Sequence, residues 1–136
     1  KSYDRYLANK VSKDKSVNGG MLHMIYKYND NYYVQARRGD TFRSISEEVG
    51  VSRRALARYN ERDKDDVLAN GDVVYLKKKH RKADKDFRNR PHTVRSGESM
   101  YAISQLYGIR LKSLYKLNHL DPEVYQIHVG DILRVR

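Results

Sequence analysis

The sequence contains no cysteine, which excludes disulfide bonds, thiolate metal sites and cysteine nucleophiles. It also lacks any apolar run close to the roughly 18 to 20 residues that a transmembrane helix requires, so we expect no segment to span a membrane. The chain begins at Lys1 without an initiator methionine, an export signal or a cleavage motif. We therefore expect it to be a piece of a longer protein, with any export signal or catalytic domain lying upstream.

Acidic residues are in the minority in this chain. The 136 residues include 28 Lys+Arg against 17 Asp+Glu, which gives a formal net charge of +11. Such an excess favours an anionic partner, such as nucleic acid, a membrane surface or an acidic wall polymer.

The sequence shows no arrangement of residues typical of an enzyme. A glycosidase needs two carboxylates that face each other across a sugar, and covalent catalysis needs a nucleophile beside a base. The carboxylates that stand out lie at turns, where capping is their common role: Asp40, Asp72, Glu98 and Asp131. The five histidines are scattered along the chain. We therefore expect no catalytic residue, no metal site and no cofactor.

The chain contains an internal repeat. Sliding the sequence against itself by 58 positions aligns residues of the same type in the same order: Gly39 with Gly97, Ile45 with Ile103, Gly50 with Gly108, Leu56 with Leu114 and Asn60 with Asn118. One extra residue in the second copy then aligns Gly71-Asp72 with Gly130-Asp131.

The repeat divides the sequence into four segments: an N-terminal extension over 1–31, a first module over 32–77, a basic linker over 78–90 and a second module over 91–136. The polar composition of the linker predicts a solvated segment, which Phe87 can pin against one module. In the extension we expect a strand over 21–28, a hairpin turn at 29–31, and loop or incomplete helix over 1–20.

Within each copy the pattern predicts the order strand, helix, helix, strand. A short alternating segment precedes Gly39 or Gly97, and the next hydroxyl residue, Thr41 or Ser99, is a good N-cap. Apolar and small residues then recur at helical spacing: Phe42, Ile45, Ser46 and Val49 in the first copy, and Met100, Ile103, Ser104 and Tyr107 in the second. Both helices of a copy can bury their apolar stripes only if they pack on one side of an antiparallel strand pair.

The ordered set of motifs resembles the LysM family. The first copy carries Gly39-Asp40-Thr41-Phe42, Gly50-Val51-Ser52, Leu56-x-x-x-Asn60 and Leu68-x-x-Gly71; the second carries Gly97-Glu98-Ser99-Met100, Gly108-Ile109, Leu114-x-x-x-Asn118 and Ile127-x-x-Gly130. The resemblance implies an α+β fold with two βααβ modules. Each module would have two helices packed on one side of a two-stranded antiparallel sheet, and an N-terminal hairpin strand would be added to the first.

The resemblance also implies a function. LysM domains bind glycans that contain N-acetylglucosamine, such as peptidoglycan and chitin, in a shallow groove between the loop entering the first helix and the loop leaving the second. Carried onto this sequence, the groove residues are Gly39, Asp40, Thr41, Phe42, Asp66, Val67, Leu68 and Ala69 in the first module, and Gly97, Glu98, Ser99, Met100, Tyr101, Val124, Tyr125, Gln126 and Ile127 in the second. Tyr101 and Tyr125 are the candidates for stacking on a sugar face.

The tandem basic modules behind a hairpin are similar to the C-terminal region of Bacteroidetes-type glucosaminidases and muramidases. We therefore expect a non-catalytic, monomeric binding region that holds a larger protein, such as a peptidoglycan hydrolase, at the cell envelope or outside the cell. The alternative is nucleic-acid binding, because Ile45 to Leu56 also satisfies a helix-turn-helix pattern with Arg53 and Arg54 opening the second helix. A helix-turn-helix domain normally needs a third helix, whereas strands flank both helix pairs here.

Overall fold

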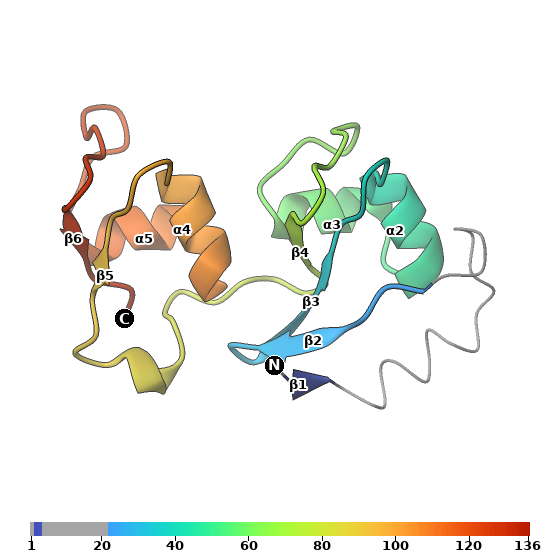
Figure 1. Ribbon diagram of the computed structural model, residues 1–136, viewed down its shortest axis with the longest axis horizontal. Helices are drawn as coiled ribbons and strands as arrows, with labels where there is room; N and C mark the ends of the chain where they lie inside the picture. The colour runs from blue at the N-terminus through green and yellow to red at the C-terminus, as the bar shows by residue number, and fades with distance from the viewer. Residues whose placement is uncertain (1, 4–21) are drawn as a thin grey trace. The chain divides into compact units, whose positions relative to one another are not determined.

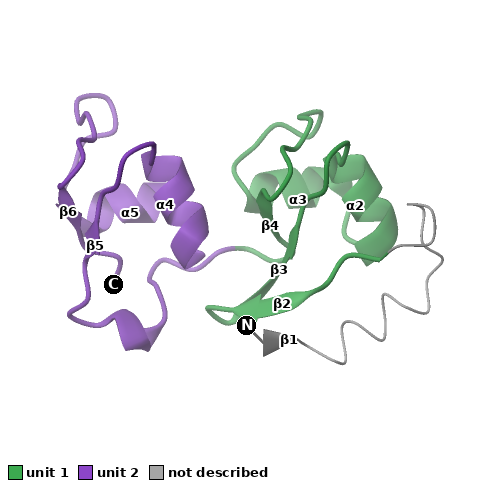
Figure 2. Cartoon of the chain, in the orientation of Figure 1, with its two compact units in different colours: residues 1–78 green, residues 79–136 purple. Residues whose placement is uncertain are grey.

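The chain forms two compact units, Lys1–Lys78 and Lys79–Arg136 (Figure 2). The computed structural model describes residues 2–3 and 22–136. Within these residues no helix is long and apolar enough to cross a membrane. The segment expected as loop or incomplete helix, 1–20, lies outside the described residues except for Ser2 and Tyr3, which form a short strand.

The first unit combines a four-stranded antiparallel sheet with two helices (Figure 1). Its elements are β1 (Ser2–Tyr3), β2 (Tyr26–Tyr28), β3 (Asn31–Gln35), α2 (Phe42–Val49), α3 (Arg53–Tyr59) and β4 (Val73–Tyr75). The strands lie in the order β1-β2-β3-β4. β3 and β4 are the expected strand pair, and β1 is an addition that the sequence pattern did not predict. β2 is the expected hairpin strand but is shorter than the predicted 21–28, because residues 22–25 form no strand.

The hairpin between β2 and β3 forms because its two turn residues accept left-handed backbone angles. Asn29 and Asp30 have φ values of 47° and 54°, and Tyr28 pairs with Asn31 across the turn. Two consecutive positive φ values are the signature of the type I′ turn, which asparagine and aspartate tolerate and which matches the twist of an antiparallel pair.

The helices begin and end where the capping residues predict. Thr41 accepts a hydrogen bond from the Ser44 amide while the Ser44 hydroxyl accepts one from the Thr41 amide, so the two residues form a capping box. Gly50 ends α2 with a φ of 77°. Ser52 caps α3 by accepting a hydrogen bond from the Ala55 amide.

The core of the first unit lies between the helices and one face of the sheet. Its buried members come from the two helices, from β3 and β4, and from the segments beside them: Ile25, Val34, Ala36, Phe42, Ile45, Val49, Leu56, Ala57, Leu68, Val74 and Leu76. One helical position departs from the expected stripe, because Ser46 is half-buried whereas Glu48 is only 1% exposed. The reason is a histidine from the N-terminal extension, described below.

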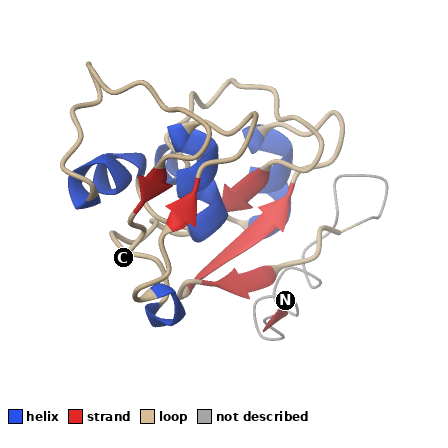
Figure 3. Ribbon diagram, turned by 60° about the vertical axis from the view of Figure 1, so that its left-hand side comes forward, coloured by secondary structure: helices blue, strands red, loops and turns tan. Residues whose placement is uncertain are grey.

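The second unit repeats this arrangement on a two-stranded sheet (Figure 3). Its elements are a 3₁₀ turn η1 (Lys85–Phe87), β5 (His92–Thr93), α4 (Met100–Tyr107), α5 (Leu111–Leu117) and β6 (Ile132–Leu133). Ser99 and Gly108 cap α4, whereas Arg110 begins α5 without a side-chain capping bond. The expected α+β fold of two βααβ modules is confirmed.

The segment expected to be a solvated linker packs instead against the second module. The Ala83 amide donates to the Val135 carbonyl at 2.7 Å, and the Phe87 ring meets the edge of Tyr107 at 5.1 Å between centroids. Lys79 is 1% exposed, and its ammonium lies 2.6 Å from Gln105 Oε1. Two apolar side chains, Ala83 and Phe87, therefore dock the segment together with hydrogen bonds from backbone and side-chain groups.

An asparagine after the second helix ties each module together. Asn60 Nδ2 donates to the carbonyls of Leu56 and Tyr75, at 2.8 and 2.9 Å, and its Oδ1 accepts from the Tyr75 amide at 2.7 Å. Asn118 makes the same bonds to Leu114 and Arg134. Each amide therefore joins the end of a helix to the closing strand.

Replacing Asn60 by alanine is expected to destabilise the first module by about 2–3 kcal/mol. The substitution removes the hydrogen bonds that the side chain makes to the buried amide and carbonyl of Tyr75. Asn60 is 1% exposed, whereas Asn118 is half-buried, so water can replace part of its bonding. Asn118→Ala should therefore cost about 1 kcal/mol. Amide hydrogen exchange resolved by residue gives the free energy of unfolding for each module. Equal losses in the two variants would contradict this account.

Candidate functional site

The two loops predicted to form the groove of the first module lie side by side. Thr41 and Val67 form an isolated antiparallel bridge, and the Leu68 amide donates to the Asp40 carbonyl at 3.0 Å. The turn before α2 and the loop after α3 are thus joined through their backbones. This contact leaves one short, continuous strip of loop on the surface.

The predicted residues of this strip divide into exposed and buried ones. Gly39 and Ala69 are exposed, and Val67 is 70% exposed. Phe42 and Leu68 are buried in the core, so their side chains support the loops and cannot meet a ligand. Thr41 is half-buried as the helix cap, and Asp66 is half-buried and paired with Arg62 at 3.1 Å.

The second module places its predicted residues in a similar way. Gly97, Ser99 and Gln126 are exposed and Val124 is 72% exposed, whereas Met100 is 5% exposed. Glu98 and Ile127 are half-buried, and Ile127 packs against the core.

The two tyrosines predicted to stack on sugars are both half-buried and already engaged. The Lys79 ammonium lies 5.7 Å from the centroid of the Tyr101 ring. The Tyr125 hydroxyl donates to Asp131 Oδ2 at 2.5 Å. Burial, together with this hydrogen bond and the charge of Asp131, raises the pKa of Tyr125 to about 12. Tyr125 therefore stays neutral and fixes its own loop.

A buried histidine anchors the groove turn of the first module. His23 Nε2 lies 2.6 Å from Asp40 Oδ2, and its Nδ1 lies 2.9 Å from Glu48 Oε2. Arg37 Nη2 also lies 3.2 Å from His23 Nδ1, so two carboxyl groups and a guanidinium surround the ring. The His23 amide also donates to Glu48 at 2.7 Å. The extension is thereby fastened to the turn and to α2.

The second module anchors the equivalent turn with a histidine of its own. His92 Nε2 lies 2.8 Å from Glu98 Oε1, and its Nδ1 lies 2.8 Å from the Tyr107 hydroxyl. Glu98 aligns with Asp40. Each carboxylate also accepts a hydrogen bond from the backbone amide three residues before it, from Arg37 to Asp40 and from Arg95 to Glu98. The two modules thus hold the same turn with the same pair of chemical groups, although the histidines come from different elements.

The comparison with known families decides the assignment. A family profile described as "LysM domain" matches residues 34–77 and 92–136. The chain belongs to the LysM family. LysM domains bind glycans that contain N-acetylglucosamine, and the chain carries two of them in tandem.

Two further relatives give the context of this tandem. The chain is 31% identical over 104 residues to an autolysin of Enterococcus faecalis, and the match covers 73% of the chain but 14% of the autolysin. It is also similar to a solved structure, the spore cortex-lytic enzyme SleL of Bacillus cereus, at 27% identity and a TM-score of 0.33, over 76% of the chain and 22% of the enzyme. The chain therefore spans only a small part of the length of each.

Sequence reasoning missed both histidine anchors of the LysM modules. His23 and Glu48 are 25 positions apart, so no local pattern joins them. One signal was present, because His23 stands two residues before the core residue Ile25, and alternate residues of an extended segment face the same side. That spacing places His23 on the inner face of the segment.

The turn carboxylates of both LysM modules make stability depend on pH. Burial alone would raise the pKa of Asp40, but hydrogen bonds from the Arg37 amide, His23 and Ser44 outweigh it and hold the pKa below its usual value. The pKa of Glu98 is lowered in the same way by the Arg95 amide and His92, against the effect of burial.

A carboxyl group whose pKa is depressed by folding stabilises the native state above its ordinary pKa of about 4, and this contribution is lost as the pH falls through the lowered value. We therefore expect the stability advantage of the wild type over Asp40→Asn and Glu98→Gln to be full at pH 7 and to shrink below about pH 4. Denaturant midpoints measured from pH 7 to pH 2.5 provide the check. A gap between wild type and variant that widens in acid would contradict the assignment.

Proposed function

We propose that this chain is a non-catalytic region that binds N-acetylglucosamine-containing glycans of peptidoglycan and holds a larger protein at the bacterial cell wall. The observation that supports the proposal is the backbone contact between Thr41 and Val67, which joins the two loops that the LysM resemblance implicates in sugar binding. Helix N-terminal amides and loop carbonyls can pair with an acetamido group, and the exposed Val67 offers an apolar surface for its methyl.

We also propose that the longer protein that carries this region is a cell-wall hydrolase. The chain spans 14% of the autolysin that it resembles, which leaves room in such a protein for a separate catalytic domain. A wall hydrolase that carries this region would keep its catalytic domain close to the polymer. The region itself would act at the cell envelope or outside the cell.

Retention of the chain by insoluble peptidoglycan and chitin tests the proposal. The measurement is made at low and high salt, with N-acetylglucosamine oligomers as competitor and duplex DNA as a parallel ligand. Because the charge of +11 attracts any polyanion, only retention that survives salt and yields to the oligomers indicates a specific site. Retention lost in salt, or binding to DNA alone, would overturn it.

Matched variants separate the groove from general electrostatics. Val67→Glu and Val124→Glu each place a carboxylate at an exposed groove position, one per module. Ile132→Glu makes the same change of charge on β6, at a side chain that is 67% exposed. The double groove variant is expected to lose retention, whereas Ile132→Glu should behave like the wild type.

A further inference from the structure

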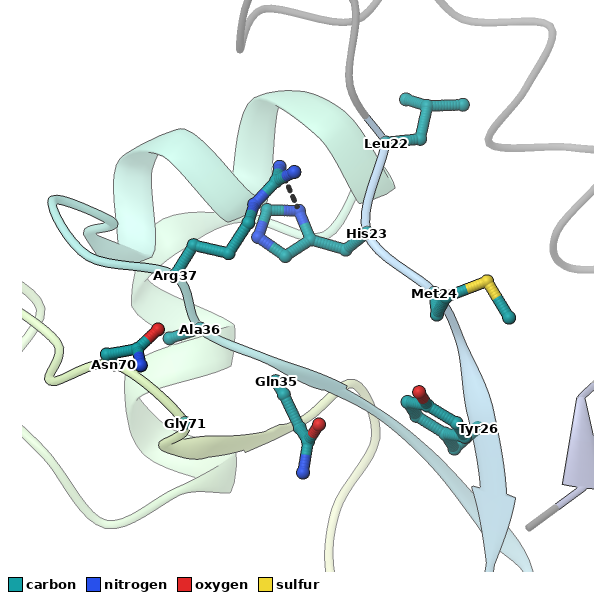
Figure 4. A pocket seen from close by; sticks show the side chains of 9 residues that line it. All are labelled: Leu22, His23, Met24, Tyr26, Gln35, Ala36, Arg37, Asn70 and Gly71. Carbon is teal, nitrogen blue, oxygen red and sulfur yellow. Dashed lines mark hydrogen bonds between the residues drawn. The ribbon is translucent and has the colours of Figure 1, made fainter.

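A pocket of about 380 Å³ lies beside the groove of the first module (Figure 4). Met24 and Tyr26 line one side of the pocket (the outer bank), Asn70 and Gly71 line the opposite side, and residues 35–37 at the end of β3 lie between them (Figure 4). Its volume is within the range of small-ligand sites. The bank at 22–26 lies outside the part of the chain that matches the LysM family.

The pocket exists because the N-terminal segment diverges from β3. β2 pairs with β3 from Tyr26 onward, but before that point His23 is drawn toward α2 by Asp40 and Glu48. His23 and Ile25 face the core, so the alternate side chains of Met24 and Tyr26 face outward. The buried contacts of His23 with Asp40 and Glu48 therefore hold open the space between this segment and Gln35.

The lining groups match the chemistry of an amino sugar. Gln35 and Asn70 are exposed amides that can each donate and accept, as hydroxyl and acetamido groups require. The Tyr26 ring is fixed by stacking on Tyr33, with 5.1 Å between centroids. Met24 is 54% exposed and adds an apolar surface. A rigid aromatic ring beside polar amides suits the alternating apolar and polar faces of a sugar.

The charge of the lining favours a sugar that carries a carboxylate. The Arg37 guanidinium is half-buried, and its Nη2 lies 3.2 Å from His23 Nδ1 (Figure 4). A guanidinium fork matches the geometry of a carboxylate. Among the described residues, no aspartate or glutamate lines the pocket. Asp40 and Glu48 face His23 on its core side.

The pocket continues the groove along the same two backbone segments. The Gly71 amide donates to the Ala36 carbonyl at 2.7 Å, and Thr41 and Val67 meet further along these segments. The Ala36–Gly71 contact and the Thr41–Val67 contact are separated by at most five residues along either segment, or roughly 17 Å of extended chain. An oligosaccharide of a few sugar units can therefore contact both.

The second module has a pocket of about 470 Å³ at the corresponding strand and turn, but its lining differs and includes the carboxylate of Glu98. Thr93 aligns with Gln35 and Val129 with Asn70, so neither amide is present. Within the described residues of the second unit, β5 pairs only with β6, so no segment takes the place of the outer bank.

We propose that the pocket at 22–26, 35–37 and 70–71 is a subsite for an acetamido sugar that carries a carboxylate, as N-acetylmuramic acid does. The inference rests on the proposed function, because it extends the glycan groove of the first module. It assigns to this module a preference for peptide-free wall glycan over chitin that the second module does not share, because a stem peptide would occupy the carboxyl group through an amide bond.

Titration of the full chain with soluble oligosaccharides of equal length tests this subsite. One series alternates N-acetylglucosamine with N-acetylmuramic acid and carries no peptide, one is the same series with its carboxyl groups reduced to alcohols, and one contains N-acetylglucosamine alone. The chain should bind the first series more tightly than the other two. Gln35→Ala/Asn70→Ala should weaken binding of the first series roughly tenfold, as expected for two lost hydrogen bonds, and change chitin-oligomer binding less than twofold.

Thr93→Ala/Val129→Ala is the matched control at the aligned positions of the second module and should leave both affinities unchanged. Gln35 and Asn70 are exposed, so their variant should fold, and an unchanged denaturation midpoint verifies this. Equal affinity for all three series, or an equal loss for all three in the Gln35→Ala/Asn70→Ala variant, would overturn the subsite alone. Failure of the wild type to bind any of the three would overturn the subsite and the proposed function together.

Discussion

Replacing His23 by alanine is expected to destabilise the first module by about 3–5 kcal/mol, the typical cost of removing one partner from a buried ionic contact. The ring nitrogens of His23 meet Asp40 and Glu48 at 2.6 and 2.9 Å, and all three side chains are almost fully buried. Without the ring, the buried carboxyl groups of Asp40 and Glu48 each lose a polar partner. A small domain has about 5–15 kcal/mol of stability, so the loss is a large fraction of the total.

Hydrogen exchange of amides in 34–76 and 92–135 reports the two modules separately. His23→Ala should raise the exchange rates of protected amides in the first range and leave those in the second unchanged. His128→Ala is the control, because the side chain of His128 is 74% exposed and substitutions at such sites change stability by about 0.5 kcal/mol or less. A similarly small change for His23→Ala would show that the buried contact contributes little.

A double-mutant cycle separates the ionic contact from packing. If the charge left in the core causes most of the loss, His23→Leu/Glu48→Leu should be more stable than the sum of the single changes predicts, with a coupling of about 1–3 kcal/mol. The repeat offers a natural comparison. Leu106 occupies the position of Glu48 in the second module and is 53% exposed, so Leu106→Glu should be nearly neutral.

Those parts of the fold that are encoded locally could be predicted from the sequence. The hairpin follows from Asn29 and Asp30, which accept positive φ values. The helix starts follow from Thr41 and Ser99, whose hydroxyl groups accept hydrogen bonds from free amides of the first turn. The helix ends follow from Gly50 and Gly108, which adopt the left-handed backbone conformation without a side-chain clash. Each of these signals acts within a few residues, so position along the chain is sufficient to read it.

Features that depend on distant partners could not be predicted in the same way. Glu48 looks like a solvent-facing helix residue until His23 is brought beside it from the extension. The segment 79–90 looks solvated because of its lysines and arginines, yet two apolar side chains and backbone bonds to the end of the chain hold it in place. A charged sequence therefore did not imply an unpacked one.

The candidate site also combines features that the sequence indicates with features that depend on the three-dimensional arrangement. The LysM resemblance indicated the two loops, and the structure joins them at Thr41 and Val67. It did not distinguish ligand-facing side chains from supporting ones, because Phe42 and Leu68 stand among exposed neighbours and are themselves buried. Nor did it indicate the adjoining pocket, which depends on where the segment before β2 diverges from β3.

Blocking the groove of one module is expected to reduce binding to polymeric peptidoglycan by about 10²-fold or more, because two linked sites on one polymer turn the second binding event into an intramolecular one. Val67→Glu in the first module and Val124→Glu in the second make the same chemical change in the predicted groove loops, at valines that are 70% and 72% exposed. For an N-acetylglucosamine oligomer too short to reach both grooves, each variant should halve the number of bound ligands and leave the Kd of the remaining groove unchanged.

Comparing the two ligands distinguishes avidity from a single working site. If both modules bind, Val67→Glu and Val124→Glu weaken retention on the polymer to similar extents, and each alters only the stoichiometry with the short oligomer, measured by calorimetry. If one variant abolishes binding to both ligands while the other changes neither, a single module binds and its partner is a scaffold. Because a shallow polar groove loses much of its contact energy to ordering and desolvation, tight retention on the wall by a single module would contradict the tandem mechanism.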